Sequence, residues 1–344
     1  FAHPLVRRAV ADTVPPHRRA AAHAAIAARL VEAGEPSMAI AHHLLQAGSA
    51  ADPHLLGLHA SVAGGEALAA GAWGEAARYF EAALAAPGYA AALPPTARAR
   101  LLYNSAFAHY RELDVPRMRS RFADAIDAFR ECGDLRGWAE SLEGWIRSAI
   151  SHGALAAEAL DDRPYREFMD AAGDREPHAR ALVMCEWAEA LYAARRPECL
   201  ALATEALDLA RELGDPYLLL HAEFALGLAS LLALDVPGAA RHFANTRGAA
   251  HQLDDPWLRC WPMQSLPIAL LGMGRLDEAD ERAIELAAAA RATHDWAITA
   301  FAIAGRVSIA TARGDFDAAE RLARQAGSLI ARSDYSWAGP LVYS

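Results

Sequence analysis

The sequence predicts an all-α protein assembled from repeated helical hairpins, and three observations support this fold class. Ala, Leu, Glu and Arg, which are strong helix formers, dominate the 344 residues, whereas Val and Ile are scattered. Apolar residues recur at intervals of three and four, the spacing of one helix face, and not at intervals of two. GRLDEADERA (274–283) and GDFDAAERLA (314–323) are near copies whose first glycines lie 40 residues apart. A fixed period of this length indicates stacked hairpins, since no hairpin buries its apolar face without a neighbour.

The turn before each second helix can be placed along the chain. In the second half of the sequence these turns follow one another at intervals of 40 residues, at Pro197, Pro237, Asp277 and Asp317. Pro116 lies 81 residues before Pro197, which leaves room for one degenerate repeat around GALAAEAL (153–160). An earlier copy is AGAWGEAARYFEAAL (70–84). The spacing therefore predicts seven hairpins.

The copy at residues 70–84 resembles the tetratricopeptide motif. Gly71, Ala76, Phe80 and Ala83 occupy the places of that motif's turn glycine, small residue, aromatic residue and alanine. The resemblance extends over roughly residues 52–333, although the period of 40 exceeds the usual 34. It implies a right-handed superhelical array of tetratricopeptide-like hairpins. It does not imply a function, because such arrays carry out many unrelated tasks.

The composition excludes several classes of protein. The formal net charge of −10 argues against a general nucleic-acid surface, which needs an excess of basic residues. The four cysteines are far apart and have no metal-binding spacing, which is typical of a reducing compartment. No apolar run of 18 residues and no signal peptide is present, so the sequence predicts a cytoplasmic protein that makes no membrane contact.

The first fifty residues do not follow the repeat. FAHPLVRRAV (1–10), the R-R-x-x-x-H of residues 18–23 and AHHLLQAG (41–48) resemble the end of the ATPase module in large ATP-binding LuxR-type transcriptional regulators of actinomycetes. The resemblance implies that residues 1–50 are the C-terminal tail of that module, with a winged-helix-like element and a helical linker. Residues 51–344 are then the sensor array.

The same resemblance implies a larger parent protein. His3 matches a histidine that contacts nucleotide phosphate in the intact regulator, and ATP is expected in an upstream domain, with no cofactor in this chain. The chain starts at Phe1 and stops inside another first helix, so we expect truncation at both ends, the C-terminal end of the array included.

Motifs for catalysis are absent from the sequence. There is no phosphate-binding G-x-x-x-x-G-K-[ST], no G-x-S-x-G and no H-E-x-x-H. His42 and His43 are adjacent, so they point to different sides of a helix and cannot both ligate one metal ion. The sequence predicts no enzyme, no catalytic residue and no metal site.

A ligand would bind the concave side of the array, which first helices line. Counting back from each turn selects Tyr103, Tyr110, Arg111, Met184, Tyr192, His221, Phe224, Trp261, Gln264 and Phe301, and Trp145 is assigned to the degenerate repeat. This mostly aromatic and apolar set suits a small apolar or aromatic molecule, or an amphipathic helix of a partner. Packing between helices would produce the same spacing, and for His221 beside Phe224 we expect packing.

Two functional hypotheses follow. The first is a non-catalytic sensor and protein-interaction array of a LuxR-type ATP-dependent transcriptional regulator, which receives a small-molecule inducer or a partner protein. Its ligand would shift the population of the regulator towards an open state. The second is a free-standing helical-repeat scaffold that binds an amphipathic peptide or a partner protein. Neither predicts direct nucleic-acid contact by this chain, and an open end of the array could self-associate.

Overall fold

The computed structural model describes residues 13–112, 114–150, 161–293 and 295–330, and every regular element in these ranges is a helix. The predicted all-α class is therefore confirmed. The helices form two compact units, residues 1–137 (unit 1) and 138–344 (unit 2). None of the described helices is both long and apolar enough to cross a bilayer. His3 lies outside the described residues.

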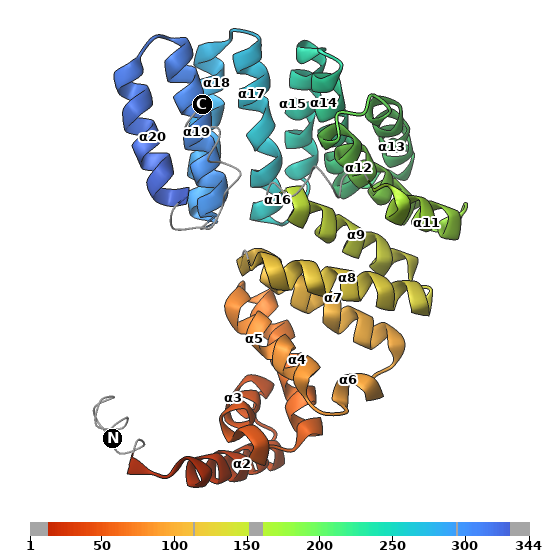
Figure 1. Ribbon diagram of the computed structural model, residues 1–344, viewed down its shortest axis with the longest axis vertical. Helices are drawn as coiled ribbons and strands as arrows, with labels where there is room; N and C mark the ends of the chain where they lie inside the picture. The colour runs from red at the N-terminus through yellow and green to blue at the C-terminus, as the bar shows by residue number, and fades with distance from the viewer. Residues whose placement is uncertain (1–12, 113, 151–160, 294, 331–344) are drawn as a thin grey trace. The chain divides into compact units, whose positions relative to one another are not determined.

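Unit 1 is a series of antiparallel hairpins (Figure 1). Its elements are α2 (Pro16–Glu32), α3 (Ser37–Ala47), η1 (Gly48–Ala50), α4 (Pro53–Ala69), α5 (Trp73–Ala85), α6 (Tyr89–Ala92), α7 (Pro95–Glu112) and α8 (Val115–Cys132). The paired helices are α2 with α3, α4 with α5, and α7 with α8. Ala41 of α3 shares one core with Ala60 of α4 and Ala76 of α5, so packing continues across the predicted boundary at residue 50.

Helix α9 (Leu135–Ile150) begins at the boundary, and unit 2 repeats the hairpin pattern. Its further elements are α11 (Arg163–Ala172), α12 (Pro177–Ala193), α13 (Cys199–Leu213), α14 (Pro216–Leu232), α15 (Val236–Ala250), α16 (Pro256–Cys260), η2 (Trp261–Gln264), α17 (Ser265–Gly272), α18 (Leu276–Ala292), α19 (Trp296–Ala312) and α20 (Phe316–Ile330). Trp138 of α9 meets Phe168 of α11 edge to face, with ring centroids 5.2 Å apart. These two helices belong to the degenerate repeat, whose predicted turn at 153–160 lies outside the described residues.

Aspartates start many of the helices. Asp52, Asp215 and Asp255 each accept hydrogen bonds from backbone N–H groups of the first turn, and the residue that follows each of them is proline. This is a favourable combination, because the carboxylate satisfies orphan donors and proline at the first helical position lacks a donor to satisfy. The same signal therefore sets the repeat register on both sides of the unit boundary.

In the hairpins α4–α5 and α14–α15, an aromatic ring of the second helix packs against a glycine of the first helix. A Cβ at Gly64 would lie 2.6 Å from the ring of Phe80, and a Cβ at Gly227 would lie 2.4 Å from that of Phe243. Both rings are almost completely buried. Phe80 and Phe243 therefore act as bulky plugs between the two helices of their hairpins, and we call the glycine opposite each ring the glycine notch.

The turns inside several hairpins hold one residue in the left-handed region. Gly71, Gly274 and Gly314 have φ between 72° and 77°, whereas Leu234 occupies the equivalent place between α14 and α15 with φ 62°. Leu234 is 85% exposed, so its side chain gains little from packing. A left-handed conformation costs a non-glycine residue about 1–2 kcal/mol.

We expect Leu234→Gly to stabilise the chain by about 0.5–1 kcal/mol, because glycine removes this strain at a smaller entropic cost. Urea denaturation followed by circular dichroism measures the effect. Leu234→Ala is the matched control, since alanine keeps the strain. An equal gain from both variants would show that losing the exposed side chain, and not the backbone strain, is responsible.

Candidate functional site

A stripe of aromatic rings and one arginine lies along one side of α7 and the start of α5 in unit 1. The ring of Tyr103 stacks on that of Phe107 at 6.3 Å, and Phe107 meets Tyr110 at 6.3 Å and Trp73 of α5 at 6.4 Å. The Arg111 guanidinium lies 4.5 Å from the centre of the Trp73 ring. Trp73, Tyr103, Phe107, Tyr110 and Arg111 are each partly exposed, and we call these five residues the α7 stripe. Tyr103, Tyr110 and Arg111 were predicted to face a ligand.

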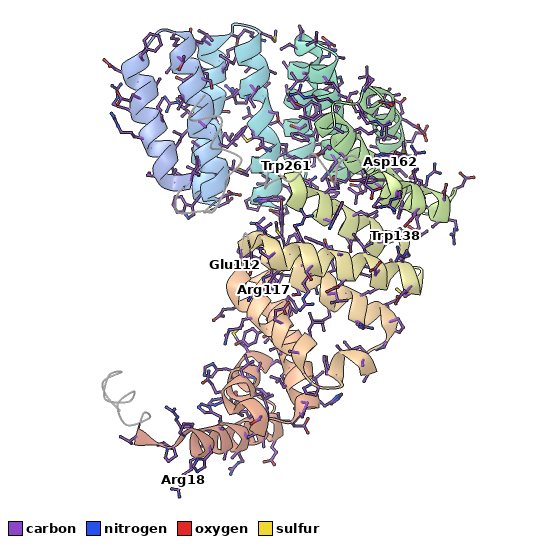
Figure 2. All side chains as sticks on the ribbon, viewed as in Figure 1. Arg18, Glu112, Arg117, Trp138, Asp162 and Trp261 are labelled. Atoms are coloured by element: carbon purple, nitrogen blue, oxygen red, sulfur yellow. The ribbon has the colours of Figure 1, made fainter. Side chains whose placement is uncertain are left out.

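A polar cavity of about 590 Å³ lies on the other side of α7. Its lining consists of Gly74, Ala77, Arg78, Glu81, His109, Glu112, Asp114 and Arg117. Two of these, Glu112 and Arg117, are labelled in Figure 2, near the end of α7 and the start of α8. In a helix His109 and Glu112 point away from Tyr103 and Phe107, so the cavity and the α7 stripe are separate surfaces.

Hydrogen bonds and ion pairs join several residues of this cavity to one another and to their neighbours. Glu81 accepts two hydrogen bonds from Arg121, each 2.7 Å long, and one from the Ser105 hydroxyl at 2.7 Å. His109 lies between Glu81, at 3.4 Å, and Asp114, at 3.6 Å. Burial alone would raise the pKa of Glu81, but hydrogen bonds from Arg121, His109 and Ser105 hold this pKa well below its usual value. Glu81 therefore stays ionised and already has its partners, which is typical of a structural ion pair.

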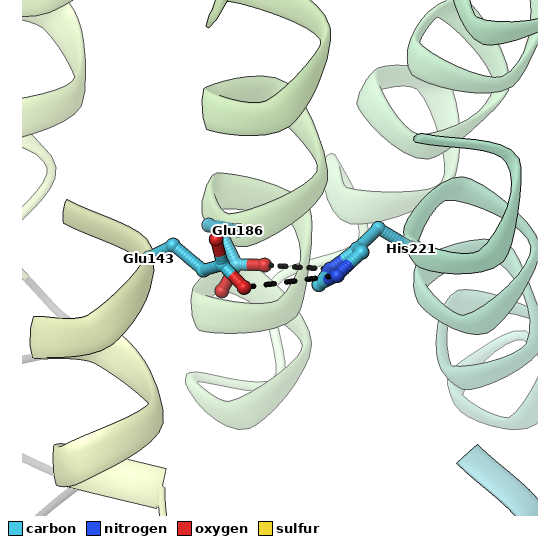
Figure 3. A group of neighbouring side chains, drawn as sticks. All are labelled: Glu143, Glu186 and His221. Atoms are coloured by element: carbon cyan, nitrogen blue, oxygen red, sulfur yellow. Dashed lines mark hydrogen bonds and ion pairs between the residues drawn. The ribbon is translucent and has the colours of Figure 1, made fainter. Parts of the chain in front are cut away.

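The second polar centre is buried in unit 2, between α9, α12 and α14 (Figure 3). Arg147 of α9 donates from Nε to Glu143 at 3.1 Å, and from Nη2 to Glu186 at 3.1 Å and to His221 Nδ1 at 2.7 Å. The Tyr217 hydroxyl donates to Glu143 at 2.6 Å. One guanidinium thus joins three helices, and we call Glu143, Arg147, Glu186 and His221 the Arg147 cluster.

Burial sets the protonation of this cluster. It lowers the pKa of His221 to about 3, with Arg147 contributing, so the imidazole is neutral. Because Nδ1 accepts from Arg147, the proton of this neutral ring is on Nε2. Burial also raises the pKa of Glu186, although Arg147 opposes this effect. The pKa of Glu189 is raised further, by burial and then by the charge of Glu186. Two carboxyls on one face of α12 thus depend on one arginine for compensation.

Carboxylate and imidazole atoms of Glu143, Glu186 and His221 lie within 4.8 Å of one another, close enough to surround a metal ion. The Arg147 guanidinium lies among them, within hydrogen-bond distance of all three. It is also stacked 4.3 Å from the centre of the Trp261 ring. The cation that this group of ligand atoms surrounds is therefore the guanidinium.

The predicted ligand-facing residues divide into two sets. Met184, His221, Phe224, Trp261 and Phe301 are at most 6% exposed. Trp145, Tyr192 and Gln264 are partly exposed, like the three predicted members of the α7 stripe. The buried side chains lie in packed cores, as expected if these residues pack between helices. For the partly exposed residues, contact with a ligand stays a prediction.

Sequence reasoning missed the arginines that organise both polar centres. Glu186 pairs with Arg147, and Arg306, at the corresponding position of another repeat, donates to Asp280 at 2.6 Å. The available signal was the repeat period, because Arg147 and Glu186 are 39 residues apart and Glu81 and Arg121 are 40 apart. Opposite charges one period apart lie on neighbouring repeats and can meet.

Comparisons with known proteins support the fold. No protein-family model and no curated protein sequence matches this chain. A crystal structure of a Rap protein complexed with Competence and Sporulation Factor aligns with a TM-score of 0.60 at 12% identity, over 86% of this chain and 81% of its own. The apo form of RapI aligns with a TM-score of 0.52 at 9% identity, over 84% and 82%.

Identities this low show the fold alone, and that fold is a tetratricopeptide-like array of helical hairpins. A signal transduction ATPase with numerous domains and a tetratricopeptide repeat sensor, from Pyrococcus horikoshii, covers 100% of this chain and 56% of its own length at 14% identity. Its TM-score of 0.46 is too low to support an argument about function.

Proposed function

We propose that this chain is a non-catalytic sensor and interaction array whose α7 stripe receives a small-molecule inducer or a segment of a partner protein. The supporting observation is the stripe itself, where partly exposed rings of Trp73, Tyr103 and Phe107 lie beside the Arg111 guanidinium. Tyr, Trp and Arg are the residues in which binding energy is most often concentrated. The stripe suits a ligand that combines an aromatic or apolar group with a carboxylate.

Two further features support a binding role over catalysis. The ionisable residues of the polar cavity and of the Arg147 cluster pair mainly with one another, which suits structural stabilisation. A Rap protein of similar fold is known in a complex with Competence and Sporulation Factor. By analogy, this chain also acts by binding.

We place this array within a LuxR-type ATP-dependent transcriptional regulator, on the motifs of residues 1–50. In that setting ATP binds an upstream domain, where His3 contacts its phosphates, and ligand binding to the array shifts the regulator towards its open state. The reading frame is then expected to contain a phosphate-binding loop before Phe1 and a helix-turn-helix after Ser344. A frame that lacks both would overturn this assignment and leave the free-standing scaffold.

Removing a ring of the α7 stripe is expected to weaken ligand binding at least about tenfold, the equivalent of 1.4 kcal/mol. The chain is first incubated with an extract of cells that carry the gene. Mass spectrometry under native and then denaturing conditions detects a bound small molecule as an excess mass that disappears on denaturation. Tyr103→Ala and Tyr110→Ala should lose this mass, whereas Trp296→Ala, which removes an exposed ring in unit 2, should retain it. Equal loss from all three variants, or none, would contradict the role of the stripe.

A further inference from the structure

Two histidines of unit 1 join neighbouring helices. Nδ1 of His23 on α2 lies 2.8 Å from Nδ1 of His43 on α3, and the ring centroids are 5.0 Å apart. One ring must donate and the other accept, so at least one of the two imidazoles is neutral. Both side chains are partly exposed, so solvent ions reach them.

This arrangement has the dimensions of two ligands of a tetrahedral metal ion. With metal–nitrogen bonds of about 2.0–2.1 Å, two imidazole ligands have nitrogens about 3.3 Å apart and ring centroids about 5.1 Å apart. The centroids of His23 and His43 already have this separation, and only the nitrogens are closer together. Rotation of each ring about its Cβ–Cγ bond moves Nδ1 while the centroid stays nearly in place, so the gap can widen without a shift of either helix.

The charge state of the rings also suits a metal ion. Burial and the neighbouring rings of His23 and His42 lower the pKa of His43, which favours the neutral imidazole that a metal requires. On binding, the proton on the donor Nδ1 leaves to solvent and the same ring takes up a proton at Nε2. The number of protons bound to the two rings is then unchanged.

We propose that His23 and His43 form a binding site for a divalent transition-metal ion such as zinc, which replaces the shared hydrogen bond and ties α2 to α3. Imidazole is a preferred ligand of zinc, nickel and copper, whereas calcium and magnesium prefer oxygen. Water or a donor from a partner completes the coordination. The His42 ring meets that of His43 edge to face, with centroids 5.3 Å apart, and belongs to the same cluster of imidazoles.

The test is calorimetric titration of the tag-free chain with Zn²⁺ near pH 7.5. The chain has 14 histidines, so the informative quantity is the difference between variants. His23→Gln and His43→Gln should each weaken one equivalent of Zn²⁺ at least about tenfold, whereas His251→Gln, which removes an exposed imidazole in unit 2, should leave it unchanged. Identical titration of the parent chain and both site variants would overturn the proposal.

Two further measurements distinguish the loss of a metal-ligating side chain from the loss of the folded structure. His23→Cys supplies a thiolate at the same place and should restore the Zn²⁺ equivalent that His23→Gln loses. Co²⁺, used as a spectroscopic probe, should give the visible absorption of a tetrahedral site in the parent chain and in His23→Cys. Failure of His23→Cys to restore binding, with α-helical circular dichroism intact, would show that His23 supports the hairpin without ligating a metal.

Discussion

Replacing Arg147 by alanine is expected to lower the free energy of unfolding of unit 2 by about 3–5 kcal/mol, because removing one partner of a buried ion pair leaves the other charge uncompensated. The Glu186 side chain is completely buried, and Arg147 also pairs with Glu143 of its own helix and with His221 of α14. Urea denaturation followed by tryptophan fluorescence reports on unit 2, where Trp138, Trp187 and Trp261 lie.

Two control variants test whether an uncompensated charge causes this loss of stability. Arg282→Ala removes an arginine from a more exposed pair with Glu285 on α18, for which a loss of about 0–1 kcal/mol is typical. Adding Glu186→Gln to Arg147→Ala should recover part of the loss, since the amide carries no charge. If Arg147→Ala costs no more than Arg282→Ala, Glu186 is protonated in the folded chain and the cluster is not held together by charge.

The hairpin architecture could be predicted from the sequence because its signals are local. The 40-residue interval between Gly274 and Gly314 reappears between the starts of α18 and α20. The turn glycine at Gly71 also has the left-handed backbone that such a turn requires. Leu234 shows the limit of this reasoning, since the repeat placed a turn there and the residue type did not reveal the conformation.

The candidate site was harder to predict, for a physical reason. A helix that packs and a helix that binds have the same 3.6-residue periodicity, so spacing alone selected both the partly exposed Tyr103 and the buried Trp261. The Arg147 cluster depends on contacts among three repeats, and no single stretch of sequence contains it. Charge pairs one period apart would have identified Arg147 with Glu186, but not the third partner His221.

The glycine notch of the first array hairpin predicts opposite effects for two adjacent substitutions. Gly64→Ala should destabilise unit 1 by about 1–3 kcal/mol, because the new Cβ would lie 2.6 Å from the Phe80 ring in a filled core. Gly65→Ala should stabilise it by up to about 1 kcal/mol, because nothing lies within 4 Å of its Cβ and alanine is the better helix former. Both glycines are inside α4, so local helix propensity is nearly the same at the two sites.

Phe80 provides the decisive comparison for this prediction. Phe80→Ala should cost about 3–5 kcal/mol as a single substitution, because the ring is 1% exposed and leaves a cavity. In the Phe80→Ala background the clash disappears, so Gly64→Ala should then be neutral or stabilising, like Gly65→Ala. A double-mutant cycle by urea denaturation measures this coupling. If Gly64→Ala remained equally destabilising in the Phe80→Ala background, the loss of stability would come from the α4 backbone. The contact between Gly64 and the Phe80 ring would then not explain why glycine occupies this place in the repeat.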